Sequence, residues 1–222
     1  MAATLEKVYQ KLLAHYGRPA GEAEAGSLAA LLVATLAPVA AQKKQKWLDD
    51  LREAGLLDAQ RLARLSPQEL QDQLAPVGNA RVNVPRLKSV LKLLVEQFDG
   101  AVEELFATPM DLLREQLLAL NGVGPETADR VLLEAGGLPS FVVDLATQRV
   151  LKRHGWVDFE ADYHAVKEYA ESSMESDPTL YRELHALLAR VGEEHCRKTP
   201  QCDGCPLADL LPEGGPREPE SW

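Results

Sequence analysis

Three cysteines gathered near the end of the chain are the most chemically distinctive side chains in the sequence. Cys196, Cys202 and Cys205 follow the spacing C-x5-C-x2-C. Three cysteines cannot all form disulfides with one another, and structural cysteines seldom cluster this tightly, so the spacing favours a metal site. Thiolates suit an iron–sulfur cluster or zinc, and the residues alone leave both open.

A glycine turn between two apolar helical stretches is a second candidate site. The turn Asn121-Gly-Val-Gly124 lies inside the apolar stretch 117–133 and precedes Pro125, a residue suited to the first turn of a helix. Two glycines permit positive φ and leave amide groups uncovered, and amides at a helix start attract phosphate. Val123 is expected to anchor the turn between the helices. Alone, the tripeptide predicts only an ordinary αα-hairpin.

A carboxylate stands at the predicted start of a later helix. The segment Gly137-Leu-Pro-Ser-Phe-Val-Val-Asp144 precedes a helical pattern over residues 145–154. Aspartate is among the best helix N-caps, which is a sufficient structural reason for Asp144. A capping position also points the carboxylate out of the helix start, so capping and a catalytic role are compatible.

Together, these segments resemble the helix-hairpin-helix (HhH-GPD) superfamily of endonuclease III-like DNA glycosylases. The family hairpin is close to Leu-x-Gly-Val-Gly-x-x-Thr-Ala, which residues 120–128 match, and its essential Val-Asp follows at the distance of Asp144. The resemblance is strongest over residues 112–154, then 192–210, and weak over 20–100. It implies an enzyme of base excision repair.

The resemblance also implies roles for individual residues. A glycosylase flips the damaged base out of double-stranded DNA and breaks its N-glycosidic bond, and Asp144 would be the catalytic carboxylate that stabilises the oxocarbenium-like sugar. The DNA-binding hairpin would comprise Asn121, Gly122, Val123 and Gly124. A monovalent cation that helps to hold the phosphate would bind the backbone carbonyls of Leu118, Leu120 and Val123.

Glu126 occupies the position of the family lysine that forms a Schiff base and permits strand cleavage. We therefore expect a monofunctional glycosylase with doubtful or weak AP-lyase activity. Gly-Val-Gly-Pro-Glu-Thr-Ala-Asp resembles the branch that removes alkylated purines, while oxidised pyrimidines stay open as substrates. An ordinary first-turn acid that interacts favourably with the helix dipole is the preferred explanation of Glu126 itself.

The loops that would enter the DNA stack depart from the family as well. Val39 stands near the place of the usual glutamine, and residues 77–80 lack the usual bulky side chain. These departures keep a rival hypothesis open, in which the chain is a catalytically impaired DNA-damage-binding protein on the same fold. The retained Asp144 favours the enzyme.

The family's cysteine loop has a fourth cysteine, where this chain has Leu211. By resemblance we expect a [4Fe–4S] cluster on Cys196, Cys202 and Cys205, with its fourth ligand from solvent or from one of three side chains: Asp209, Asp203 or His195. Zinc bound by the three thiolates and His195 is the alternative. The remaining histidines are interpreted as ordinary surface or core residues; they are His15, His154, His164 and His185.

Leucine and alanine dominate the chain, and valine does not occur in alternating runs, so we expect an all-α fold. The helices are predicted at 4–15, 28–36, 43–54, 58–65, 68–74, 85–97, 110–119, 126–135, 145–154, 162–174 and 179–194. The resemblance implies two helical lobes with a DNA groove between them. These are a six-helix barrel with the hairpin over residues 25–138 and a lobe of residues 1–24 plus 139–211; residues 212–222 are predicted to be a disordered tail.

The formal net charge of −10 argues against a nucleic-acid partner when it is taken alone. Basic residues nevertheless cluster, at Lys43, Lys44 and Lys46, at Arg81, Arg86, Lys88 and Lys92, and at Arg149, Lys152 and Arg153. We interpret them as a basic face on an acidic body or as ordinary solvated helix surfaces. No apolar stretch approaches the roughly 20 residues that cross a bilayer, so we expect a cytoplasmic monomer with no membrane association.

Overall fold

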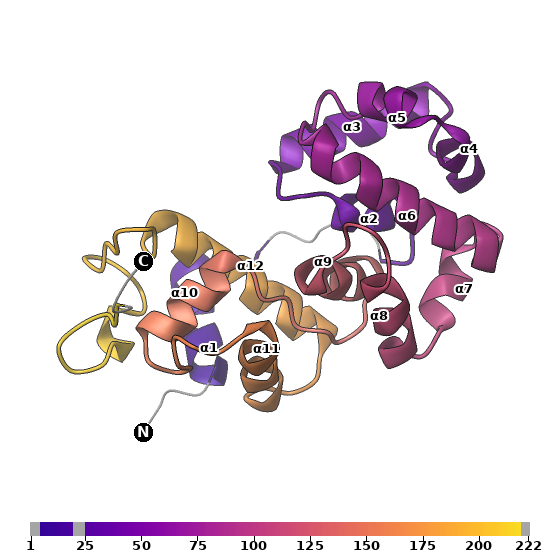
Figure 1. Cartoon of the computed structure of the whole chain (residues 1–222). Helices are drawn as coiled ribbons and strands as arrows, with labels where there is room; N and C mark the ends of the chain where they lie inside the picture. The colour runs from indigo at the N-terminus through magenta and orange to yellow at the C-terminus, as the bar shows by residue number, and fades with distance from the viewer. Residues whose placement is uncertain (1–4, 20–24, 219–222) are drawn as a thin grey trace. The chain divides into compact units, whose positions relative to one another are not determined.

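The computed structural model describes residues 5–19 and 25–218, and these residues form helices joined by loops (Figure 1). Within these ranges the only β-type pairing is an isolated bridge between Cys196 and Pro200. The prediction of an all-α chain is confirmed. The elements are α1 (Leu5–Tyr16), α2 (Leu28–Thr35), α3 (Ala41–Glu53), α4 (Ala59–Arg64), α5 (Pro67–Gln73), α6 (Ala80–Phe98), α7 (Val102–Ala107), α8 (Met110–Leu118), α9 (Pro125–Arg130), η1 (Val131–Ala135), α10 (Leu145–Arg153), α11 (Tyr163–Ser172), α12 (Pro178–Glu194) and η2 (Ala208–Leu210).

The chain divides into two compact units. One comprises residues 22–138, and the other comprises residues 1–21 together with 139–222. The hairpin therefore belongs to the first unit, and both Asp144 and the cysteines belong to the second.

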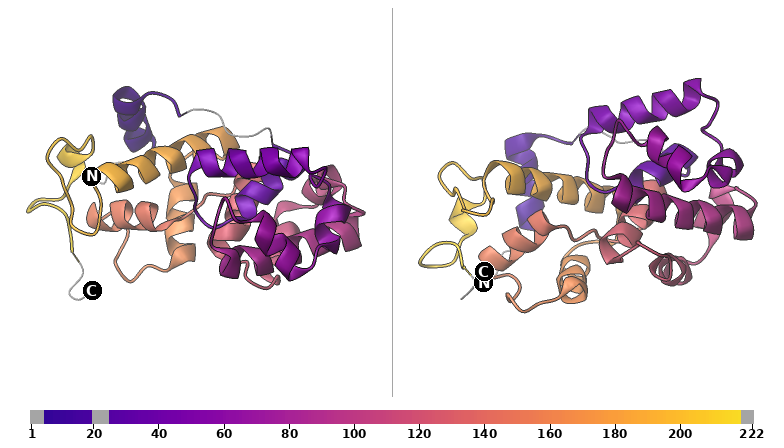
Figure 2. Two further views of the ribbon diagram at one scale, coloured as in Figure 1. Left: turned by 90° about the horizontal axis from the view of Figure 1, so that it is seen from above. Right: turned by 45° about the horizontal axis from the view of Figure 1, so that its top comes forward.

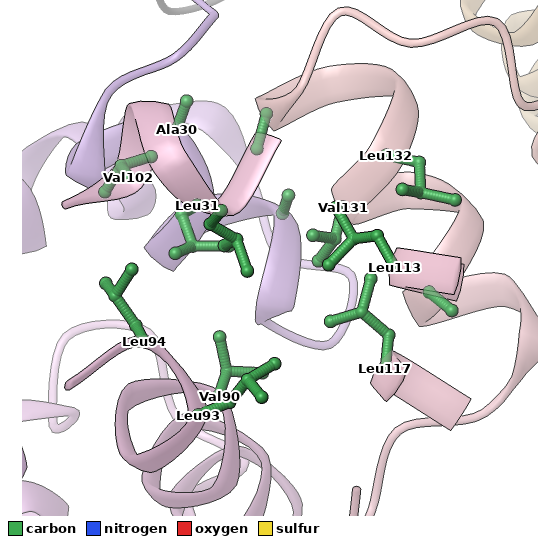
Figure 3. Packing of buried hydrophobic residues seen from close by; sticks show 14 of the residues in the cluster. Ala30, Leu31, Val90, Leu93, Leu94, Val102, Leu113, Leu117, Val131 and Leu132 are labelled. Atoms are coloured by element: carbon green, nitrogen blue, oxygen red, sulfur yellow. The ribbon is translucent and has the colours of Figure 1, made fainter. Parts of the chain in front are cut away.

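Helix α2 is enclosed by apolar residues on two sides. Leu31 belongs to one buried cluster with residues of α6, α7, α8, α9 and η1, and Figure 3 shows Leu31, Leu117 and Val131 turned toward this shared interior. Leu32 belongs to a second buried cluster, which includes Trp47 of α3 and residues of α4, α5 and α6. A helix that is apolar nearly all round suits burial on every side, as predicted for this segment.

Helix α6 begins at Ala80, earlier than the start predicted at Pro85, and Pro85 lies inside the helix. Proline has no N–H to donate within a helix, so its usual place is the first turn. Here the buried Asn83 side chain holds the preceding turn: its amide donates to the Gly78 carbonyl at 2.9 Å and its oxygen accepts from the Ala37 amide at 2.8 Å. These tertiary hydrogen bonds account for the earlier start.

Two further differences concern short elements. The six-residue helix α7 was not predicted, and only Val102 and Leu105 of it are buried. The predicted helix over 126–135 instead begins at Pro125 and continues as the π-helical turn η1. Four of the five residues of η1 are buried, which places this irregular turn within the core.

In the unit that contains Asp144, α12 supplies much of the buried surface, and α1 and α10 pack against it (Figures 1 and 2). The contact between α10 and α12 is close. A Cβ atom built on Gly192 would lie 2.4 Å from the Cβ of Ala146, nearer than real Cβ atoms approach. Glycine at this position therefore allows the two helices to meet.

Residues 212–218 of the predicted disordered tail form a turn that returns to α10. The Gly215 amide donates to the Pro212 carbonyl at 3.0 Å, and the Arg217 amide donates to the Arg153 carbonyl at 2.9 Å. Residues 219–222 of that tail lie outside the described residues. None of the described helices combines the length and the apolarity needed to span a membrane.

Candidate active site

Asp144 is the N-cap of α10. Its backbone is extended, and its Oδ1 accepts the Thr147 amide at 2.7 Å, which satisfies one of the amides that a helix start leaves without an internal partner. The capping role predicted for this residue is confirmed. The bond also fixes the carboxylate at the end of the helix.

The other carboxylate oxygen faces a histidine from α12. Oδ2 of Asp144 lies 3.5 Å from Nε2 of His185, and the two side chains are 22% and 15% exposed. Burial by itself would raise the pKa of the Asp144 carboxyl. The facing imidazole and the Thr147 amide outweigh it and hold the pKa well below its ordinary value of 3.8. Asp144 is therefore ionised at neutral pH.

The segment that precedes Asp144 is held by α11. The Phe141 amide donates to Glu171 Oε1 at 2.8 Å, and Lys167 Nζ donates to the buried Ser140 hydroxyl at 2.8 Å. Lys167 and Glu171 also form an ion pair one turn apart on α11. The approach to the carboxylate is thus fixed by hydrogen bonds as well as by its three buried apolar residues, which are Phe141, Val142 and Val143.

The hairpin joins α8 to α9. Gly122 adopts φ +81°, a conformation that favours glycine, whereas Gly124 is extended with φ −97°, so the positive φ of the turn is at Gly122. Val123 is buried in the apolar cluster between the helices, as predicted. Its amide donates to the Leu120 carbonyl at 3.2 Å, which closes the turn.

Two arginines and Glu126 surround this hairpin. Arg86 of α6 donates through Nε to the Gly122 carbonyl at 2.7 Å, and burial, together with the charge of Arg130, lowers the pKa of Arg86. Glu126 forms an ion pair with Arg130, whose Nη1 also donates to the Leu36 carbonyl at 3.2 Å. The position of the family lysine thus holds a carboxylate that already has a cationic partner.

Several cations of the predicted basic clusters bind carbonyl groups of their own unit. Lys88 Nζ lies 2.6 Å from two carbonyl oxygens at the end of α4. Arg149 donates to the Cys196 carbonyl at 2.9 Å, and Lys152 donates to a loop carbonyl at 2.8 Å. Arg153 is 1% exposed. These side chains donate to groups of their own unit or are buried. Fewer of them are therefore available to contact DNA than the sequence predicts.

The three cysteines line one cavity of about 20 Å³ together with His195 and Leu211. Burial is the main cause that raises the pKa values of the Cys202 and Cys205 thiols. Sulfur donors are the ligands that iron–sulfur clusters and zinc prefer, so the donor chemistry fits such a group. In the described ranges, however, no three His, Cys, Asp or Glu side chains are close enough together to hold a metal ion.

The three side chains considered as a fourth ligand differ in their surroundings. His195 lines the thiol cavity, whereas neither Asp203 nor Asp209 is among its lining residues. Both carboxylate oxygens of Asp209 lie 2.6 Å from Lys11 Nζ on α1. The structure therefore brings His195 to the thiols and places Asp209 in an ion pair.

A family model described as HhH-GPD superfamily base excision DNA repair protein matches residues 2–176. The chain belongs to this superfamily. Among its relatives is a Methanocaldococcus jannaschii protein assigned as a DNA repair glycosylase, 34% identical over 207 residues that cover 92% of this chain and 94% of the relative. Endonuclease III of Bacillus subtilis is 31% identical over 68% of this chain and 65% of its own length. The HhH-GPD protein described here is a DNA repair glycosylase of the endonuclease III kind.

Solved structures share the fold of this glycosylase. A trapped endonuclease III–DNA covalent intermediate aligns with a TM-score of 0.74 at 22% identity over 95% of each chain. The 3-methyladenine DNA glycosylase of H. pylori, bound to 1,N6-ethenoadenine, aligns with a TM-score of 0.69 at 22% identity over 86% of this chain and 96% of that one. At these identities the likeness shows the fold alone.

Sequence reasoning missed one residue at the carboxylate of this glycosylase. His185 was interpreted as an ordinary surface or core histidine, and the structure places it opposite Asp144. No local motif marks it, because the two residues lie on different helices that meet only in the folded unit. The signal available in the sequence was a histidine on the amphipathic helix 179–194, which does not by itself indicate a partner.

Proposed function

We propose that this glycosylase excises damaged bases from double-stranded DNA by hydrolysis, with Asp144 as the catalytic carboxylate. The observation that carries the proposal is the Asp144 carboxylate held at the start of α10, with one oxygen on the Thr147 amide and the other toward His185. A fixed negative charge stabilises the positive charge that develops on the sugar as the N-glycosidic bond breaks.

In the proposed reaction, the damaged base leaves from C1′ with the bonding electrons, and the base or its surroundings take up a proton. A water molecule, oriented by Asp144, then forms a new C1′–oxygen bond and loses a proton. The products are a free base and an abasic site. The base must first leave the helical stack, since it cannot be reached inside a duplex.

The presence of Glu126 at the position of the family lysine supports base excision without strand cleavage. Its carboxylate cannot form a Schiff base with the sugar, and its ion pair with Arg130 gives it a separate function in holding the start of α9. We expect the abasic product to be released without strand cleavage, or with only weak cleavage by another route.

The hairpin would hold the DNA backbone. Gly124 precedes α9, and the amides around the turn are suited to a phosphate oxygen. A monovalent cation on the carbonyls of Leu118, Leu120 and Val123 would add charge to the same contact. Alkylated purines and oxidised pyrimidines are both proposed as substrates, and a thymine/uracil-DNA glycosylase of Pyrobaculum aerophilum, 32% identical over 67% of this chain, shows that relatives act on other bases too.

For the cysteines we propose a [4Fe–4S] cluster held by Cys196, Cys202 and Cys205, with zinc bound by these thiolates and His195 as the alternative. The three thiols of one loop supply the donor chemistry for such a group, which would stabilise the loop that follows α12, and binding it requires the side chains to move closer together. Anaerobically purified protein should be brown and contain iron and sulfide. Colourless protein with stoichiometric zinc would overturn the cluster.

The deciding experiment measures base excision from labelled duplexes that carry thymine glycol, a 3-methyladenine analogue or hypoxanthine, with and without alkali. Strand breaks that appear only after alkali and are lost in Asp144→Asn would support the proposal and identify the lesion. Breaks without alkali would contradict the interpretation of Glu126. Binding to lesion DNA with no excision of any base would instead support the catalytically impaired damage-binding protein.

A further inference from the structure

The contact between α10 and α12 brings a histidine to the catalytic carboxylate proposed above. Nε2 of His185 is buried and has no hydrogen-bond partner among the described residues, and the polar group that it faces is Asp144 Oδ2, at 3.5 Å. A buried polar nitrogen costs free energy unless it has a partner, so this contact is the physical reason for the orientation of the ring.

We propose that His185 is a positioning residue for base excision, which orients the Asp144 carboxylate toward the reacting sugar through Nε2. The inference rests on the proposed function, because it assigns a role only if Asp144 acts in excision.

The two carboxylate oxygens of Asp144 have different partners, which supports this role. Oδ1 is committed to the Thr147 amide at 2.7 Å, which leaves Oδ2 as the oxygen that can meet substrate or water. The Thr147 bond alone allows the carboxylate plane to rotate about the side-chain bonds. A second donor on the opposite oxygen fixes that plane, and the His185 contact also favours the ionised carboxylate.

The surrounding packing fixes His185 in turn. Its neighbours Glu183 and Leu184 are buried, and Glu183 accepts a hydrogen bond from Tyr9 of α1 and pairs with Arg18 at 3.3 Å. On the other side, the close approach of Gly192 to Ala146 holds α12 against the helix that Asp144 caps. The donor and the carboxylate are therefore parts of one rigid helix pair.

Two carboxamide variants test the contact. In His185→Gln the side-chain amide reaches the place of Nε2, whereas in His185→Asn it is one methylene shorter and falls short of Oδ2. We expect His185→Asn to slow single-turnover excision about ten- to hundredfold, the effect of losing a polar partner of a charged group. His185→Gln should stay close to the wild-type rate. Both variants should bind a duplex with a tetrahydrofuran abasic-site analogue as tightly as the wild type.

The exposed His15 on α1 provides a matched control, since His15→Asn changes a histidine of the same unit far from this contact in sequence. Equal rates for His185→Asn and the wild type would overturn the role of His185, and so would equal losses in the Asn and Gln variants. Asp144→Asn is measured alongside. Full activity of Asp144→Asn would refute the proposed function itself, whereas its inactivity beside an active His185→Asn would refute only the inference about His185.

Discussion

The hairpin and the start of α10 are both helix N-termini, but they present different groups. At the hairpin the backbone is exposed. Gly122 has a positive φ, and the Arg86 side chain donates a hydrogen bond to the Gly122 carbonyl. At α10 a side chain is presented, and the Asp144 carboxylate is held by one amide and one imidazole.

This difference teaches how the two sites depend on the rest of the fold. A turn that binds through its backbone amides depends on a few residues that are adjacent in sequence. The side chains that pack against such a turn can differ without changing its amides. A carboxylate that works through its orientation needs partners at set distances from other helices. Substitutions should therefore affect stability at the hairpin and orientation at α10.

The largest effect on stability is expected behind the hairpin. Asp129 is fully buried and pairs with Arg114 at 2.8 Å. Asp129→Ala leaves the partly buried guanidinium without this carboxylate, which should cost about 3–5 kcal/mol in the free energy of unfolding. Urea unfolding measures it. Asp50→Ala, which removes an exposed pair with Lys46, is the control and should leave stability unchanged within error. A similarly small change for Asp129→Ala would show that the hairpin does not rely on the buried pair.

Gly192→Ala tests the helix contact at the other site. The new Cβ would lie 2.4 Å from the Ala146 Cβ and 3.2 Å from its Cα, so α10 and α12 must separate. We expect a loss of about 1–3 kcal/mol by thermal unfolding, together with slower excision because Asp144 and His185 move apart. Gly124→Ala in the hairpin is the matched control, since its Cβ would meet no atom within 4 Å and its φ is negative. Equal stability of the two variants would contradict the close approach.

A third prediction separates capping from catalysis at Asp144. Both substitutions remove the charge, but only Asp144→Ala also removes the cap, so it should be less stable by about 1 kcal/mol than Asp144→Asn, which can still accept the Thr147 amide. Both variants should lose excision. Chemical unfolding and single-turnover kinetics measure the two effects, and a stable, inactive Asn variant would sharpen the contrast with the hairpin.

The same residue predicts a dependence on pH. The unfolded chain protonates this carboxyl near its ordinary pKa of 3.8, and folded Asp144 does so only at lower pH. Its contribution to stability is therefore complete above the ordinary value and is lost as the pH falls through the lowered one. Acid unfolding of the wild type should show this added loss relative to Asp144→Asn. Parallel curves would mean that the carboxyl is not stabilised in its ionised form.

The smallest effect is expected at Tyr9, behind the helix that carries His185. Burial and the hydrogen bond to Glu183 raise the pKa of Tyr9 to about 12 from 10.0. Stability from the neutral phenol is present below pH 10.0 and is lost as the pH rises through about 12. An alkaline titration followed by ultraviolet absorbance should show one late-titrating tyrosine fewer in Tyr9→Phe. No difference would show that the contact with Glu183 is weak in solution.

Local signals explain what could be predicted. Asp144 as a cap, the glycine turn with its anchoring Val123, and the central helix that begins after Ser27 all depend on residues within a few positions of one another. Their conformational preferences depend on neighbouring residues and require no long-range contact. The match of the hairpin and Asp144 to one family pattern follows from the same short segments.

The sequence by itself therefore determined the helical fold, the turn and the position of the carboxylate. Only the tertiary structure decided which groups contact the carboxylates and the turn: His185 opposite Asp144, Arg86 on the Gly122 carbonyl, and Lys11 on Asp209. Each of these contacts joins residues from different elements or depends on a side-chain conformation set by packing. Helix periodicity and capping specify the course of the backbone, whereas the distance between two distant side chains is set only when their helices pack together.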